Sequence, residues 1–122
     1  MARIQIVDDE KIILLLLRKI LQQMNYDVVA EASNGVEAVE KALEHKPDLI
    51  LMDISMPGQF DGISAAEKIN AAADIPIIFV TAYSKDMYKE RLERVKYCSY
   101  IVKPIDMSQL QENIEKCLKR NC

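Results

Sequence analysis

Short apolar segments rich in β-branched residues alternate with longer amphipathic segments along the whole chain. The apolar segments are almost continuously hydrophobic, as strands are when helices cover both faces of a parallel sheet. The predicted strands are residues 3–7, 27–32, 48–53, 75–81 and 100–102. The segments with helical spacing are residues 11–24, 34–45, 61–72, 84–95 and 106–120. Strand–helix units repeated in this way predict a doubly wound α/β fold with a parallel five-stranded sheet.

Capping residues support several of these boundaries. Asn34 and Gly35 stand at the start of the second predicted helix, and Pro47 follows its end. Ser84 and Asp106 stand where they can cap the last two helices. The sequence shows no internal repeat or linker, so we expect a single domain over residues 1–122.

Composition narrows the classes of function. Half of the 122 residues are hydrophobic and the net charge is −3, which argues against a nucleic-acid partner because binding phosphate backbones requires a clustered basic face. The longest apolar run, residues 12–17, is too short to span a membrane, and the N-terminus lacks a signal-peptide pattern, so we expect a cytoplasmic protein without membrane contact. Cys98, Cys117 and Cys122 are odd in number and suit a reducing compartment better than a disulfide framework.

Polar residues stand at the carboxyl end of four predicted strands. In an open α/β sheet this edge is where ligands bind. The residues are Asp8, Asp9, Asp53, Thr81 and Lys103. Crowded carboxylates repel one another unless a cation neutralises them, and Mg²⁺ prefers such oxygen ligands together with phosphate oxygens. A carboxylate beside Mg²⁺ can also act as a nucleophile toward phosphorus.

Several motifs together resemble the receiver domain of two-component response regulators. They read VDDE, LMDISMP, DGI, PIIFVTAY and YIVKPI, and the resemblance runs from residue 3 to about residue 119. It implies a flavodoxin-like sheet with strand order 2-1-3-4-5 and five helices on its two faces. This strand order is the one known for CheY-like members of the family, and the periodicity of the chain does not itself predict it.

The resemblance also implies a role for each acid. Asp53 would accept a phosphoryl group from a phosphohistidine. Asp9 would bind Mg²⁺ directly and Asp8 mainly through water, with the backbone carbonyl of Ser55 as a further ligand. The protein would then be a signalling domain rather than an enzyme with an external substrate, although it takes part in its own phosphorylation and slow dephosphorylation.

The remaining motif residues would form the switch. Lys103 would pair with Asp53 or with the phosphoryl group, and the peptide bond between Lys103 and Pro104 would be cis. Thr81 would turn to hydrogen-bond the phosphoryl group, and Tyr100 would rotate inward. Phosphorylation adds about −1.5 to −2 charges and three strong acceptors, enough to favour one of two packings.

The resemblance implies a sensor histidine kinase or a phosphotransfer protein as the partner, an unknown downstream partner, and a possible homodimer through the fourth helix, the fifth strand and the fifth helix.

Helical spacing in the first predicted helix assigns Ile13, Leu16, Leu17, Ile20 and Met24 to the core. Leu14 and Leu15 are left on the exposed face, where we predict a docking patch for the helices of a kinase.

Two features depart from the family pattern. The loop MPGQFDGI, residues 56–63, is one residue longer than usual, with Phe60 as the extra residue. Lys96 stands where the family often has the glycine that ends the fourth helix, so we expect that helix end to be irregular.

Two other functions share parts of this pattern. A phosphatase of the haloacid dehalogenase type also forms an aspartyl phosphate with Mg²⁺, but it needs a second acid two residues after the first, where this chain has Ser55. A flavodoxin-like FMN-binding module needs a phosphate-binding loop after the first strand, where Asp8 and Asp9 would repel a phosphate. The resemblance fits both a stand-alone receiver and a receiver cut from a hybrid kinase or a longer regulator.

Overall fold

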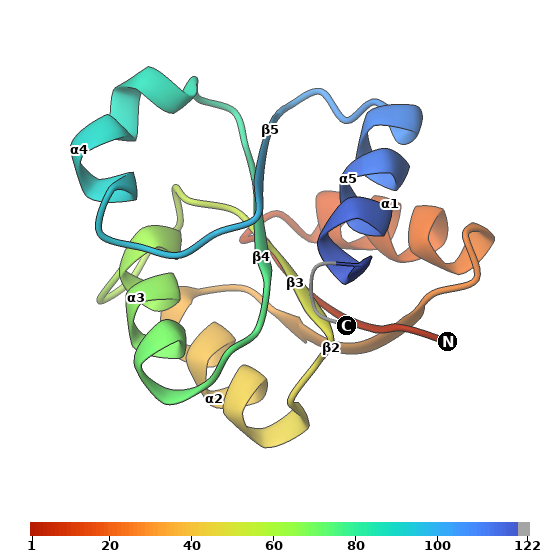
Figure 1. The fold of residues 1–122 in the computed structure, drawn as a ribbon, viewed down its shortest axis with the longest axis horizontal. Coiled ribbons are helices and arrows are strands. Elements are labelled where there is room, and N and C mark those ends of the chain that lie inside the picture. The colour runs from red at the N-terminus through yellow and green to blue at the C-terminus, as the bar shows by residue number, and fades with distance from the viewer. Residues whose placement is uncertain (120–122) are drawn as a thin grey trace.

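A computed structural model describes residues 1–119 and contains one parallel five-stranded sheet (Figure 1). The strands are β1 (Arg3–Val7), β2 (Asp27–Ala32), β3 (Leu49–Met52), β4 (Ile77–Thr81) and β5 (Ser99–Val102). Their order in the sheet is β2-β1-β3-β4-β5, and every neighbouring pair is parallel. This confirms the predicted fold class and strand order.

Helices cover both faces of the sheet. They are α1 (Lys11–Gln23), α2 (Gly35–His45), α3 (Gly62–Ala72), α4 (Lys89–Leu92) and α5 (Met107–Lys119). Helices α1 and α5 lie on one face, and α2, α3 and α4 lie on the other (Figure 1). A separate apolar core fills each side, one around Phe79 and Ile54 and the other around Ile6 and Leu17. No helix within residues 1–119 has both the length and the apolar character needed to cross a membrane.

The predicted caps of α2 and α5 are present. The Asn34 side chain accepts a hydrogen bond from the Glu37 amide at 2.9 Å, and the Glu37 side chain accepts one from the Ser33 amide at 2.9 Å. This pairing resembles a capping box, and it satisfies two backbone donors at the start of the helix. The Asp106 carboxylate accepts from the Ser108 amide at 2.9 Å at the start of α5.

The predicted helix over residues 84–95 is wrong in extent. The segment forms a 3₁₀ turn over Lys85–Tyr88, then the single turn of α4, and Ser84 makes no capping hydrogen bond. Within these two elements Leu92 is the one buried residue, so little apolar surface stabilises a longer helix. The expected irregular end near Lys96 is part of this short, weakly packed segment.

The rotation of α1 differs from the prediction. Leu14 is buried, whereas Leu16, assigned to the core, is 45% exposed and Leu15 is 53% exposed. The buried stripe of the helix is formed by Leu14, Leu17, Ile20 and Leu21. The predicted patch of Leu14 and Leu15 is therefore wrong for Leu14, and the exposed apolar surface consists of Ile12, Leu15 and Leu16.

The interpretation of the cysteines is also corrected. Cys98, just before β5, forms a disulfide with Cys117 on the buried face of α5, with Cα atoms 5.9 Å apart. The fold brings these residues together although 19 positions separate them in sequence. Cys122 lies outside the described residues.

Candidate functional site

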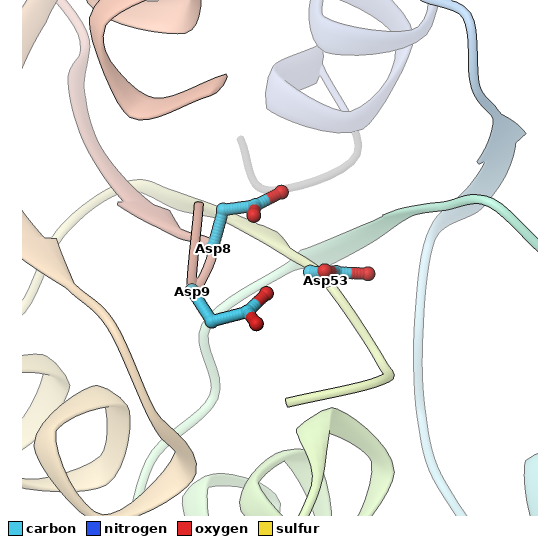
Figure 2. A group of neighbouring side chains, drawn as sticks. All are labelled: Asp8, Asp9 and Asp53. Atoms are coloured by element: carbon cyan, nitrogen blue, oxygen red, sulfur yellow. The ribbon is translucent and has the colours of Figure 1, made fainter. Parts of the chain in front are cut away.

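The register of the sheet brings the predicted acids together. Val7 pairs with Met52 in neighbouring parallel strands, so Asp8 and Asp53 leave the sheet side by side. The Asp53 amide donates to the Val7 carbonyl at 3.0 Å, which extends the ladder to the residue of the site itself. Figure 2 shows the side chains of Asp8, Asp9 and Asp53 projecting to the same side, and their carboxylate oxygens lie within 4.8 Å of one another. Asp8 and Asp53 are buried, and Asp9 is exposed.

Lys103 reaches this cluster from the end of β5. Its backbone amide donates to the Thr81 carbonyl at 2.7 Å, which fixes the chain beyond the last sheet pair. Its ammonium group lies 2.7 Å from Asp8 Oδ2 and 3.6 Å from Asp53 Oδ2. The peptide bond between Lys103 and Pro104 is cis, as the resemblance implied. One largely buried cation therefore contacts two of the three acids.

The charges in this cluster perturb one another. Burial, and then the charge of Asp8, raise the pKa of Asp53 from 3.8 to about 6, although Lys103 and a hydrogen bond from the Ile54 amide act in the opposite direction. Burial alone would lower the pKa of Lys103, but its hydrogen bond to Asp8 and the charge of Asp53 outweigh this and raise it. The cluster thus has more negative charge than Lys103 can neutralise.

Asp53 opens into a cavity of about 190 Å³ at the carboxyl edge of the sheet. The other residues that line it include Asp9, Ser55, Thr81, Tyr83 and Lys103. The Thr81 hydroxyl is fully buried and forms no well-aligned hydrogen bond within the described part of the chain. A buried hydroxyl without a well-aligned partner is costly, so this group is available to bind a ligand in the cavity.

Tyr100 is linked to Tyr83, one of the residues that line this cavity. Its hydroxyl donates to the Tyr83 carbonyl at 2.8 Å, and its ring lies 6.4 Å from that of Phe79 in the core. Burial, followed by the charges of neighbouring tyrosines, raises the pKa of Tyr100 to about 12. The hydroxyl is therefore protonated at neutral pH and remains a hydrogen-bond donor.

The donor set fits a hard divalent cation. Three carboxylates supply oxygen ligands only, and oxygen ligands without sulfur or imidazole suit Mg²⁺. The raised pKa of Asp53 reflects an unfavourable negative charge that such an ion would relieve. The Ser55 carbonyl is a candidate for a further ligand, because Ser55 lines the same cavity two residues after Asp53.

Two supports of the site were not identified from the sequence. A Cβ atom on Gly62 would lie 2.0 Å from the Asp53 carbonyl oxygen, so only glycine allows α3 to pack this close to the backbone of Asp53. The extra loop residue Phe60 packs against Gly35 and beneath the Lys68 ammonium, which lies 5.2 Å from its ring centre. The DGI motif was visible in the sequence, but this close packing depends on the folded geometry.

The sequence profile of the response regulator receiver domain matches residues 4–115. The chain belongs to this family. It is 39% identical to the chemotaxis protein CheY of Bacillus subtilis over 117 residues, which are 95% of this chain and 97% of that protein. It is 41% identical to the transcriptional regulatory protein PdtaR of Mycobacterium tuberculosis, over 97% of this chain but 57% of that protein. The chain thus spans just over half of the length of PdtaR.

Solved receiver domains have the same fold. The signal receiver domain of a modulated diguanylate cyclase from Desulfovibrio desulfuricans G20 has a TM-score of 0.91 and 32% identity, covering 98% of this chain and 95% of that one. The receiver domain of a sensor histidine kinase from Pseudomonas aeruginosa PAO1, with a magnesium ion coordinated in its active-site cleft, has a TM-score of 0.86 and 27% identity, covering 97% and 98%. Because the chain belongs to the receiver family, the two alternatives considered from the sequence, a phosphatase of the haloacid dehalogenase type and an FMN-binding flavodoxin-like module, are set aside.

Proposed function

We propose that this receiver accepts a phosphoryl group on Asp53 from a phosphohistidine of a sensor kinase or a phosphotransfer protein, with Mg²⁺ bound by the neighbouring acids. The observation that carries the proposal is the convergence of Asp8 and Asp9 to within 4.8 Å of Asp53, with the Lys103 ammonium 3.6 Å from the Asp53 carboxylate. Two acids and an amine around one buried carboxylate suit the transfer of a charged group better than a structural role.

In the proposed transfer, a carboxylate oxygen of Asp53 forms a bond to phosphorus while the phosphorus–nitrogen bond of the donor breaks. The freed imidazole takes up a proton from water. Asp53 must be ionised to attack, and with a pKa of about 6 it is mostly ionised at neutral pH. Asp8, Asp9, Asp53 and the Ser55 carbonyl would hold Mg²⁺, which neutralises charge on the transferred oxygens when bound.

Lys103 and Thr81 would stabilise the aspartyl phosphate from two sides. The Lys103 ammonium already faces Asp53, and the Thr81 hydroxyl is buried beside the same cavity without a well-aligned partner among the described residues. A hydrogen bond from Thr81 to the new phosphoryl oxygens would move the end of β4. Tyr83 would move with it and release Tyr100, whose hydroxyl it now holds.

The partners follow from the same proposal. A histidine kinase or phosphotransfer helix would contact the exposed Ile12, Leu15 and Leu16 of α1, which begins three residues after Asp8. The moving surface around α4, β5 and α5 would contact the downstream partner or a second copy of the chain. We place this exchange in the cytoplasm, which is consistent with the receiver family.

The test is labelling by a small acyl phosphate, measured by intact mass with and without Mg²⁺. The wild type should gain the mass of one phosphoryl group only with Mg²⁺, and Asp53→Asn should gain none. Asp27→Asn serves as a matched control, because Asp27 is an exposed acid at the opposite end of the sheet and should not affect labelling. Labelling that persists in Asp53→Asn, or that does not need Mg²⁺, would contradict the proposal.

A further inference from the structure

An ion pair joins α4 to the start of α3. Arg91 Nη1 lies 2.7 Å from Asp61 Oδ2, and Arg91 Nη2 lies 2.8 Å from Asp61 Oδ1, so the guanidinium binds both oxygens of the carboxylate. The same Asp61 carboxylate caps α3 by accepting from the Ser64 amide at 3.0 Å. Burial opposes ionisation of Asp61, but the hydrogen bonds from Arg91 and from Ser64 outweigh it and lower the pKa of Asp61. A guanidinium that binds both oxygens of a carboxylate interacts more strongly than one that makes a single hydrogen bond.

The start of α3 is in turn fixed to the backbone that carries Asp53. Gly62, next to Asp61, donates its amide to the Ile54 carbonyl at 2.8 Å. Its Cα approaches so closely that an added Cβ would lie 2.0 Å from the Asp53 carbonyl oxygen. Asp61 is therefore a rigid point close to the proposed phosphoacceptor.

The segment that carries Arg91 has few other attachments. Of residues 82–95, all of which the structure describes, only Leu92 and Val95, at its end, are buried, and Tyr88 is half-buried. The Tyr88 ring lies 6.4 Å from that of Tyr83 in an edge-to-face arrangement, and the Tyr83 carbonyl accepts the Tyr100 hydrogen bond. None of residues 82–91 is buried, so the ion pair is one of the few contacts that fix this part of the segment in place.

We propose that Arg91 is a positioning residue whose two-point contact with Asp61 holds α4, and with it Tyr83 and Tyr100, in the arrangement observed. The inference rests on the proposed function. For Thr81 to turn toward a phosphoryl group on Asp53, residues 82 and 83 must follow it, and a fixed α4 resists that movement. Breaking the ion pair lowers this resistance, so it favours the phosphorylated arrangement.

The experiment compares the rate of labelling by an acyl phosphate with saturating Mg²⁺ in Arg91→Gln, Asp61→Asn and the double variant. Asparagine caps helices as well as aspartate does, so Asp61→Asn removes the ion pair and keeps the cap. The two single variants change the local charge in opposite directions but remove the same contact. Arg94→Gln is the matched control, because it removes an equal charge from the same segment at an exposed side chain for which no ion pair is found among residues 1–119.

We expect each single variant to label about two- to five-fold faster than the wild type, the range that a partly exposed ion pair supports. The double variant should match the singles, Arg94→Gln should match the wild type, and Arg91→Lys, which keeps the charge but loses the two-point contact, should lie between. Thermal unfolding verifies that every variant is folded.

Rates that move in opposite directions in Arg91→Gln and Asp61→Asn would show a simple charge effect and overturn the inference. Unchanged rates, or an equal gain in Arg94→Gln, would also overturn it while the proposed function stands. A wild type that takes no label refutes the proposed function, and this inference with it.

Discussion

Replacing Asp53 by asparagine should stabilise the protein at neutral pH in the absence of divalent metal. The pKa of Asp53 rises from 3.8 to about 6 on folding, because burial and the charge of Asp8 disfavour the ionised form. Each pKa unit corresponds to about 1.4 kcal/mol, so the ionised carboxylate costs the folded state about 3 kcal/mol. Asparagine has a similar shape and no charge, and removes this cost.

The sign of the pH dependence follows from the direction of the shift. A carboxyl group with a raised pKa binds its proton more tightly when folded, so the cost is absent below pH 3.8 and grows as the pH rises. The full cost of the ionised Asp53 carboxylate is reached above a pH of about 6. The difference in the free energy of unfolding between Asp53→Asn and the wild type should therefore be near zero in acid and reach up to about 3 kcal/mol at a pH of about 7.5.

Mg²⁺ should reverse much of this difference. A cation held by Asp8, Asp9 and Asp53 stabilises the folded wild type by about 2.7 kcal/mol when its concentration is about a hundred times the dissociation constant. Asp53→Asn has lost one of the three carboxylates and should gain less. The two proteins should thus approach each other in stability as Mg²⁺ is added.

Urea unfolding followed by circular dichroism, with a chelator or with Mg²⁺, measures both effects across the pH range. Asp27→Asn should leave the pH profile unchanged, because Asp27 is exposed and distant from the cluster. A variant that is no more stable than the wild type at neutral pH in chelator, or a gain that does not depend on pH, would refute the reasoning.

Two further predictions concern the disulfide and the exposed face of α1. Reducing the disulfide between Cys98 and Cys117, which are 19 positions apart, should lower the free energy of unfolding by about 3 kcal/mol, measured by urea unfolding with and without reductant. Alkylation should show that the two thiols are free only after reduction. Equal stability in both conditions would then contradict the prediction. Leu15→Lys should slow phosphoryl transfer from a cognate kinase but not labelling by an acyl phosphate, because Leu15 is 53% exposed and is not one of the site residues. Leu14→Lys should instead lower the stability of the protein, because Leu14 is buried. Unchanged transfer from the kinase to a folded Leu15→Lys protein would exclude the docking surface.

The fold was predictable because short, mostly apolar segments alternate with longer segments of helical spacing along the chain. The convergence of Asp8 and Asp53 was also predictable in outline, since both directly follow strands of one parallel sheet. The strand order came from the family resemblance and not from the pattern itself. The disulfide was missed because pairing depends on the distance between Cys98 and Cys117, which the folded packing of α5 sets and the sequence spacing does not show.

The error in α1 has a different cause. Residues 12–17 are six consecutive apolar residues, and such a run fits several rotations of a helix equally well. The buried side is decided further along, where Ile20 and Leu21 face the core and place Leu14 on the same side. Leu15 and Leu16 are then exposed whatever their hydrophobicity, and in the proposed function they belong to the surface that a kinase helix would contact.

Three features that do not favour the stability of the folded chain lie at or next to the carboxyl edge of the sheet. Asp53 carries an unfavourable buried charge, Thr81 has a buried hydroxyl without a well-aligned partner among residues 1–119, and α4 is held by little apolar contact. Asp53 lacks enough neutralising positive charge, Thr81 lacks a well-aligned hydrogen-bond acceptor among the residues that the structure describes, and α4 has, besides its ion pair to Asp61, little apolar packing. In the proposed function, a cation bound to the acids would supply the positive charge, and a phosphoryl group on Asp53 would supply the acceptor for Thr81. In the same proposal, a hydrogen bond from Thr81 to this phosphoryl group would move the end of β4 against α4, and the weak packing of α4 would let that movement reach the surface.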